Sequence, residues 1–260
     1  MSDAATTKPS LDISSIPEKP GIVAVDAQGA KFQYFDLVLA GFVTIILCSN
    51  FIGPGKSCRI ELFGHPVVFG AGNLFFPISY IFDDVITEVY GYAKNRRVIW
   101  CGFFALLFGA VMSYAIIDLP MNPDEPYNLR LQPAIELVFG NSLRIVIASM
   151  IGFWVGDFVN SYTMAKMKIW TKGQKLWTRT IGSTIVGEGV DSIMFYPIAF
   201  FGLWSNSTLA RVILFNWLFK VAVEVVLTPV TYKIVGWLKK AEGVDVFDRG
   251  TDFSPFTLEA

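Results

Sequence analysis

The sequence predicts an all-α membrane protein with six transmembrane helices, and three observations support this fold class. The 260 residues are 53% hydrophobic and only 17% charged, whereas soluble domains carry about 25% charged residues. Six apolar stretches are long enough to approach the roughly 20 residues that cross a bilayer core. Basic residues gather in every second connection between these stretches, as they do in multi-pass membrane proteins.

The six predicted spans are separated by short connections. They cover approximately residues 35–52, 68–91, 98–119, 143–166, 177–203 and 211–238. Between the first two spans, residues 57–68 alternate around the turn Gly64-His65-Pro66 and predict a short outer hairpin. The prolines between residues 120 and 133 predict a rigid outer loop.

The distribution of basic residues predicts the orientation of the chain. Lysines and arginines follow the second, fourth and sixth spans, at residues 94–97, 166–179 and 239–240. The positive-inside rule therefore places both termini in the cytoplasm.

The two ends of the chain are predicted to be tails around a single transmembrane domain, residues 31–240. Residues 1–30 are polar and contain prolines but no apolar core of a signal peptide, so we expect a disordered cytoplasmic tail. Residues 241–260 are expected to form a second cytoplasmic tail.

Composition and motifs exclude several classes of function. The net charge of −1 offers no basis for binding nucleic acid. We find no nucleophile–base set, Walker motif, dinucleotide fingerprint or cluster of metal ligands. Cys48, Cys58 and Cys101 lack metal-binding spacing, and His65 lies in a turn. We therefore predict no cofactor, no metal and no enzymatic activity.

Ionisable residues lie where the bilayer would be driest. Asp157, Glu188, Asp191, Lys220 and Glu224 fall near the middle of apolar stretches. A charge at such a position costs roughly 2.5–3.5 kcal/mol on insertion scales. A chain that accepts this cost repeatedly is expected to hold a polar passenger, a proton or an ion. This favours a transporter over an anchor or a soluble enzyme.

In the second span, Tyr80, Asp84 and Glu88 recur every four residues and share one helix face. They could form a polar stripe along a substrate path, with Asp84 and Glu88 lining its inner exit. Alternatively, the two acids pair with Arg96 or Arg97 at the inner surface.

In the fourth span, Asp157 and Asn160 lie on one side of the helix, and Trp154 shares that side. An acid beside a flat aromatic ring suits a planar ligand that forms hydrogen bonds. The alternative is an interhelical hydrogen bond that stabilises the bundle. The sequence leaves both open.

The fifth span carries the strongest indication of a site. Glu188 and Asp191 are i, i+3 neighbours, and Gly187 and Gly189 flank the first acid. Because glycine has no side chain, a ligand or another helix could approach closely there.

In the sixth span, Lys220 and Glu224 are one turn apart and could form an ion pair, either structural or involved in coupling. Lys220 could instead balance the acids of the fourth and fifth spans. Two carboxylates held close together would favour protonation of one of them, which could drive transport.

Several motifs, taken in order, resemble the queuosine precursor transporter family, formerly grouped as vitamin uptake transporters. They are SNFIGPGK, FPISYIFDDVITEVYGY, WTRTIGST, GEGVDS and the final TDFSPF. The resemblance covers about residues 35–256. The chain departs from the family pattern at Asp83, which we expect to point toward a neighbouring helix, and at Glu188, where relatives can have glutamine.

The resemblance implies an inner-membrane importer of 7-cyano-7-deazaguanine, 7-aminomethyl-7-deazaguanine or both, for the queuosine modification of tRNA. It also implies a fold similar to the substrate-binding component of energy-coupling-factor transporters. Whether the protein forms a homodimer is left open. The family's polar motif residues would correspond to Asn50, Lys56, Asp84, Glu88, Tyr90, Arg179, Ser183 and Asp191.

The predicted pocket suits this implied ligand. A deazaguanine presents a ring N–H and an amine side by side, and a carboxylate can accept both. Glu188, Asp191 or Asp157 could supply that carboxylate. The ring carbonyl needs a donor, for which Asn160, Asn73 or a backbone N–H near Gly189 are candidates. The aromatic walls would be Trp154, Tyr80 and Phe195.

Two other functions fit parts of the sequence. One is a vitamin-binding membrane subunit of an energy-coupling-factor transporter driven by a separate ATPase. Ala40 and Gly41 on the first span are small enough for docking, but no run of alanines follows. The other is a membrane enzyme whose acids perform acid–base chemistry.

Overall fold

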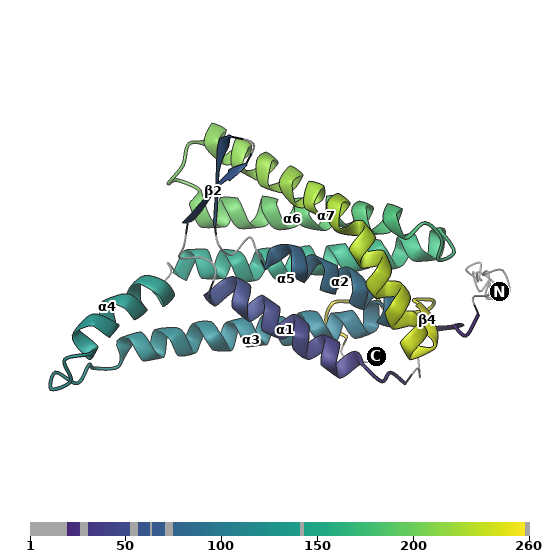
Figure 1. The fold of residues 1–260 in the computed structure, drawn as a ribbon, viewed down its shortest axis with the longest axis horizontal. Helices are drawn as coiled ribbons and strands as arrows, with labels where there is room; N and C mark the ends of the chain where they lie inside the picture. Colours follow the sequence, from purple (N-terminus) through teal and green to yellow (C-terminus); the bar gives the residue numbers. More distant parts are fainter. Residues whose placement is uncertain are drawn as a thin grey trace, which may run out of the picture.

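Seven α-helices and four short strands make up the part of the protein that the computed structural model describes, residues 20–26, 31–52, 57–62, 64–70, 75–140 and 143–257 (Figure 1). The helices are α1 (Phe35–Phe51), α2 (Phe76–Tyr90), α3 (Tyr92–Asp118), α4 (Asn128–Phe139), α5 (Leu143–Trp170), α6 (Leu176–Phe200) and α7 (Asn206–Glu242). The strands are β1 (Val23–Asp26), β2 (Ser57–Leu62), β3 (His65–Gly70) and β4 (Val244–Phe247). The mainly helical architecture agrees with the predicted fold class.

Three helices are long and apolar enough to cross a membrane, namely α3, α5 and α7, with 27, 28 and 37 residues. Helix α1 is apolar but has 17 residues. Helix α2 begins at Phe76, not near residue 68 as expected, because β3 occupies His65–Gly70. A membrane protein is therefore supported, whereas the count of six spans stays a prediction.

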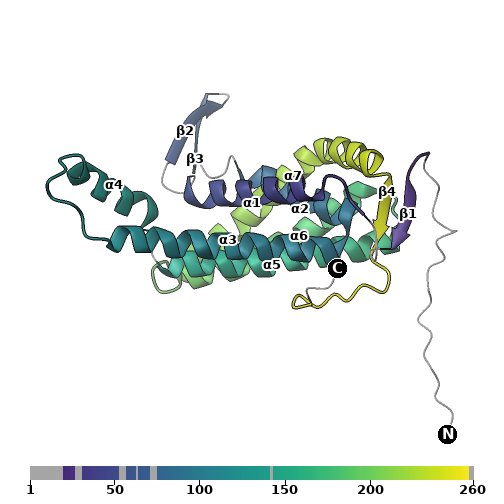
Figure 2. The ribbon, with the colours of Figure 1, turned by 90° about the horizontal axis from the view of Figure 1, so that it is seen from below.

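The hairpin and α4 lie at one end of the helix bundle (Figure 2). Strands β2 and β3 pair antiparallel from Ser57↔Gly70 to Leu62↔His65, as the alternation in the sequence predicts. The connection expected to be a rigid loop contains the short helix α4 instead, with Pro133 inside it and no buried residue.

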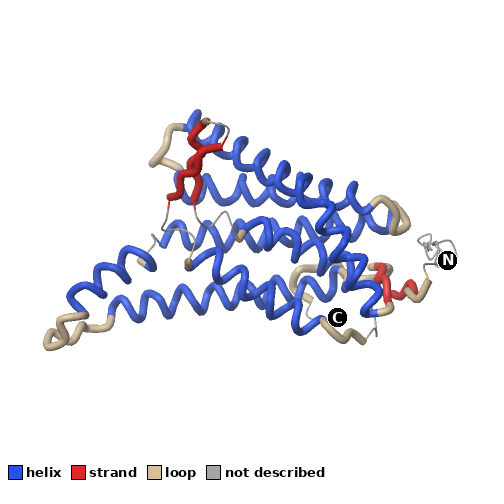
Figure 3. The backbone as a smooth tube through the Cα atoms, viewed as in Figure 1, coloured by secondary structure: helices blue, strands red, loops and turns tan. Residues whose placement is uncertain are grey.

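The opposite end carries the two strands nearest the termini (Figure 3). Strand β1 pairs in parallel with β4, from Val23↔Val244 to Asp26↔Phe247. Part of the predicted N-terminal tail is thus an ordered strand, and most of the rest of that tail lies outside the described residues. A parallel pair needs a long crossover, which here is the whole helical domain.

The segment after β4 packs against α3. Arg96 donates to the carbonyl oxygens of Asp252 at 2.6 Å and Ser254 at 2.8 Å. The indole N–H of Trp100 donates to the carbonyl of Pro255 at 2.8 Å. This explains why Arg96 is buried, and it gives the TDFSPF motif a structural role as a strap across α3.

Only one residue separates α2 from α3. Gly91 has φ +82°, which favours glycine over residues with a side chain. A Cβ there would also lie 2.9 Å from Val246. The carboxylate of Asp248 accepts the backbone N–H of Tyr92 at 3.0 Å, so it caps the exposed donors at the start of α3.

Helices α5 and α6 pack closely along a seam of glycines. Cβ atoms added at Gly152 and Gly156 would lie 2.6 and 2.8 Å from side-chain atoms of Asp191. A Cβ at Gly187 would lie 2.6 Å from Cβ and 2.9 Å from Cα of Asn160. Small residues let helix backbones approach in this way, and here the approach places Asp191 against α5 and Asn160 against α6.

Gly187→Ala should reduce stability, because the added methyl group meets the backbone of α5 and overpacking of this kind costs about 1–3 kcal/mol. The matched control is Gly236→Ala in α7, where nothing lies within 4 Å of the Cβ position. That change should leave stability equal or raise it, because alanine is preferred to glycine in helices by about 0.8–1 kcal/mol. Thermal unfolding in detergent measures both, and equal midpoints would contradict the proposed seam.

Candidate functional site

A cavity of about 280 Å³ lies between α1, α2, α5, α6 and α7. Its charged and amide lining consists of Asn50, Asp83, Asp84, Asp157, Asn160, Glu188, Asp191, Asn216 and Lys220. Its aromatic lining consists of Phe42, Tyr80, Phe153, Phe195, Tyr196 and Phe219. The structure thus brings most of the predicted site residues, from five of the six predicted spans, to one cavity.

The lining residues belong to the parts of these helices nearer the β2–β3 hairpin. They lie at 42–50 in α1, 79–84 in α2, 149–160 in α5, 184–196 in α6 and 216–223 in α7. In each helix more of the remaining residues lie on the side of the β1·β4 end than on the side of the hairpin (Figure 1). The cavity is therefore displaced toward the hairpin end of the bundle.

Lys220 reaches across to both acids of α6. Its ammonium lies 2.7 Å from Oε2 of Glu188 and also bonds Oδ2 of Asp191. It is 5.9 Å from the ring centroid of Tyr80. The sequence left open whether Lys220 pairs with Glu224 or balances the acids of other spans. The structure pairs it with the two acids of the fifth predicted span.

A second polar group joins α2 to α5 and α3. Nδ2 of Asn160 donates to Oδ2 of Asp83 at 2.6 Å and to Oδ1 of Asp84 at 3.1 Å. Nδ2 of Asn95 donates to the other oxygen of Asp83 at 2.6 Å. Asp83 thus reaches a neighbouring helix, as expected, but it also lines the cavity.

Two atoms of this second group are left without partners. Asp84 is 1% exposed, and its Oδ2 makes no hydrogen bond among the described residues. Asn160 is 7% exposed, and its Oδ1 also lacks a donor there. Buried acceptors are nearly always satisfied in folded proteins. Both atoms are almost inaccessible in this structure, so a small rotation of these two side chains would present them to a ligand's donors in the cavity.

The remaining predicted residues lie in several places. Asn50 lines the cavity and accepts from Ser149 at 3.2 Å. Asn73 lies outside the described residues. Glu224 is fully buried in α7, and within the described chain neither of its oxygens has a hydrogen-bond partner.

Trp154 faces away from the cavity. Its ring centroid lies 5.5 Å from that of Trp100 in α3 and 5.8 Å from that of Phe256 in the C-terminal segment. Phe153 lines the cavity in its place. Trp154 and Phe153 precede Asp157 by three and four residues, so both lie near its helix face. Packing against α3 turns Trp154 away from the cavity and leaves Phe153 toward it.

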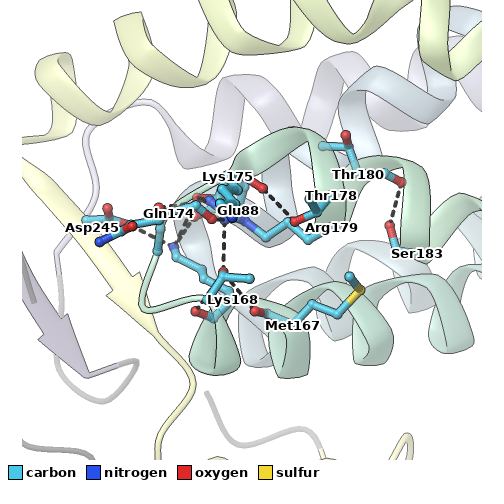
Figure 4. Close-up of polar contacts among 12 residues, drawn as sticks. Glu88, Met167, Lys168, Gln174, Lys175, Thr178, Arg179, Thr180, Ser183 and Asp245 are labelled. Atoms are coloured by element: carbon cyan, nitrogen blue, oxygen red, sulfur yellow. Dashed lines mark hydrogen bonds and ion pairs between the residues drawn. The ribbon is translucent and has the colours of Figure 1, made fainter.

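Glu88 lies apart from the cavity in a buried ion cluster (Figure 4). Arg179 of α6 donates from Nε and Nη2 to its two oxygens, both at 2.7 Å. Lys239 of α7 bonds Oε1, and Lys168 of α5 donates to the backbone carbonyl of Glu88 at 2.6 Å. Glu88 is 0% exposed. Its partners come from α5, α6 and α7, and the predicted alternative, pairing with Arg96 or Arg97, is wrong for Glu88.

Asp245 of β4 completes the cluster. Its carboxylate lies 2.7 Å from Lys168 and 2.6 Å from Lys239. Burial opposes ionisation of Asp245, but the two lysines outweigh it and lower the pKa of Asp245 to about 2. The cluster joins four helices and β4, and it closes the bundle on the β1·β4 side of the cavity.

Sequence reasoning missed several residues that line the cavity, among them Asp83, Ser149, Phe153 and Tyr196. Phe153 and Ser149 precede Asp157 by four and eight residues, so helical periodicity through that acid would have found both. Asp83 had no such signal, because it lies about 100° around the helix from Asp84.

The sequence matches a family model described as "Putative vitamin uptake transporter" over residues 70–234, which is more than half of the chain. The chain belongs to this vitamin uptake transporter family. Membership confirms the resemblance seen in the motifs, and it makes the protein a membrane transporter and not an enzyme.

One relative of this protein comes from Bacillus subtilis (strain 168) and is named "Probable queuosine precursor transporter". The two proteins are 29% identical over 197 residues, which cover 75% of this chain and 81% of the relative. No solved structure matches the chain. The matched region of the family model includes all the helices that line the cavity except α1.

Glu88→Gln should strongly destabilise this transporter, because removing one partner of a buried ion pair costs about 3–5 kcal/mol. Asp245 would then be the one carboxylate left in the cluster, paired with Lys168 and Lys239, and Arg179 would lose its charged partner. The control is Glu61→Gln in the hairpin, where the pair with Arg59 is 65–75% exposed and such pairs contribute about 0–1 kcal/mol. Unfolding midpoints in detergent test this, and a loss for Glu88→Gln no larger than the control's would show that the cluster is not stabilising.

Proposed function

We propose that the protein imports queuosine precursors, 7-cyano-7-deazaguanine or 7-aminomethyl-7-deazaguanine, across the inner membrane. The observation that carries this proposal is the cavity in which Glu188, Asp191 and Lys220 lie beside aromatic rings. Ligand pockets of this kind combine apolar walls with a few polar groups that orient the ligand. The name of the Bacillus subtilis relative supports the same ligand class.

The acids of α6 suit the hydrogen-bonding edge of a deazaguanine. Lys220 contacts one oxygen of Glu188 and one of Asp191. Each carboxylate has two oxygens and about four lone-pair positions, so acceptor positions remain for a ring N–H and the adjacent amine. Two parallel hydrogen bonds of this kind confer geometric specificity as well as affinity.

The same lysine can serve the ring carbonyl. An ammonium has three donors, and Glu188 and Asp191 take two of them. The third lies beside the hydroxyl of Tyr80, and a ligand carbonyl would take it in place of that hydroxyl. The amide donors of Asn160, predicted for this role, are directed to Asp83 and Asp84 instead.

Aromatic side chains would enclose the flat ring. Tyr80 comes from α2, Phe153 from α5, and Phe195 with Tyr196 from α6, and all four line the cavity. Aromatic pairs in stacked or edge-on contact contribute about 0.5–1.5 kcal/mol beyond area burial. A ligand held in this way is discriminated by both its shape and its polar edge.

In this proposal the six predicted spans correspond to α1, α2, α3, α5, α6 and α7, and both termini are cytoplasmic. The β1·β4 end then faces the cytoplasm, because the basic residues Lys94, Arg96, Lys168, Lys172 and Lys239 gather near it. The cluster around Glu88 would close the inner side of the cavity. Release to the cytoplasm would require that cluster to open, and Asp84 precedes Glu88 by one turn along this path.

Glu188→Gln and Asp191→Asn should each weaken binding of 7-aminomethyl-7-deazaguanine to the purified protein by about 10–100-fold, because a hydrogen bond to a charged group is worth about 1.5–3 kcal/mol. Calorimetric titration in detergent measures the affinities. The control is Glu136→Gln in α4, which is exposed and remote from the cavity. If both cavity variants bind as the wild type does, the ligand does not use these acids.

Import can be tested directly in cells that cannot make the two precursors but can still convert them to queuosine. Supplied with either precursor, they should accumulate queuosine-modified tRNA only when they express this protein, and less of it with Glu188→Gln. Modified tRNA that appears equally without the gene would refute the proposed function.

A further inference from the structure

We propose that the cavity contains a second subsite, formed by Asp84 and Asn160 next to Asp83, that binds a primary ammonium group on the ligand. This inference rests on the proposed function and refines it. The transporter should prefer a deazaguanine with a cationic aminomethyl substituent over one with a neutral cyano group.

The distribution of charge around the cavity is uneven. Among the described lining residues, five have carboxyl groups, and Lys220 is the one cation. Lys220 is committed to Glu188 and Asp191 on α6. The acids that α2 contributes therefore have no lysine or arginine of their own within the described lining.

Among the described residues, the hydrogen-bond donors to Asp83 and Asp84 are uncharged. Asn95 and Asn160 donate through their amides at 2.6 Å to Asp83, and Asn160 also donates to Asp84 at 3.1 Å. Amides satisfy hydrogen bonds but do not cancel charge. A buried carboxylate without an opposite charge is costly and tends to take up a proton. A cation from outside the protein would compete with that proton for this part of the cavity.

The unpartnered atoms indicate where that cation would bind. Oδ2 of Asp84 and Oδ1 of Asn160 are both buried acceptors without a donor in the described chain, and both residues line the cavity. The two side chains are already joined by one hydrogen bond, so the two free oxygens lie on neighbouring groups. An ammonium has three donors and no acceptor, which matches a position that offers acceptors only.

The two subsites would bind different parts of the ligand. In a deazaguanine, the ring N–H and its amine lie on the six-membered ring, whereas the substituent at position 7 projects from the five-membered ring. Acids of α6 would hold the first edge, and the Asp84–Asn160 group would hold the substituent. A nitrile at position 7 offers only an acceptor, and acceptors would then face acceptors.

The test compares three ligands on the full-length protein at neutral pH. They are 7-aminomethyl-7-deazaguanine, its 7-cyano counterpart and 7-hydroxymethyl-7-deazaguanine, which is close in size to the first but uncharged. Because charge-assisted hydrogen bonds are the stronger ones, the wild type should bind the aminomethyl compound at least about tenfold more tightly than either neutral compound. Similar affinities for all three would overturn the inference, and would also indicate that the α2 carboxyls are protonated.

Asp84→Asn provides the second measurement. It should weaken binding of the aminomethyl compound by at least about tenfold more than it weakens binding of the cyano compound. The control is Asp36→Asn, an exposed position at the start of α1, which should leave the ratio unchanged. An equal loss for both ligands would overturn the ammonium subsite.

These results separate the inference from the proposed function. If none of the three ligands binds the wild type, the proposed function fails. If the ligands bind without regard to charge, the function stands and the ammonium subsite fails. If Asp84→Asn does not fold, the comparison of the three ligands on the wild type still decides the question.

Discussion

The dominant constraint on this protein is the cost of burying carboxylates in a helical bundle that has little water. The structure meets it in two ways. Near the β1·β4 end, Glu88 and Asp245 are surrounded by Arg179, Lys168 and Lys239, so each acid is paired. Near the hairpin end, one lysine serves a cavity lined by five acids. The fully paired cluster suits structural closure, and the incompletely paired cavity suits a site that awaits a polar ligand.

The close approach of α5 and α6 connects packing to recognition. Gly152, Gly156 and Gly187 have no side chains, and this leaves room for Asp191 and Asn160 between the two helices. The same glycines that hold the two helices together therefore orient one acid of the proposed ligand edge and the amide of the ammonium subsite. Because both subsites share this interface, a change in the separation of α5 and α6 would alter both at once, which is a direct way to couple binding to a conformational change.

Helical periodicity predicted which residues share a face but not which neighbours that face would meet. Tyr80, Asp84 and Glu88 lie on one stripe, yet the structure divides it: the first two line the cavity, and Glu88 enters the ion cluster. Its partners are 91 and 151 residues away along the chain. Arg96 and Arg97 are nearer along the chain and were expected as alternative partners, but Arg96 binds the C-terminal segment instead. Trp154 shows the same limit, since packing against Trp100 turned it away from the cavity.

The sequence was enough to predict a mainly helical chain, acids within its apolar stretches, a hairpin after the first helix and membership of a transporter family. These properties follow from composition, local periodicity and motifs, which act within a few residues. The pairing of β1 with β4 and the bonds of Lys220 to Glu188 and Asp191 rather than to Glu224 became visible in the tertiary structure. So did the Asp84 oxygen that lacks a hydrogen-bond donor in the described chain. Each of these depends on contacts between distant segments, and the energies of such contacts are set by burial and by the partners that packing makes available.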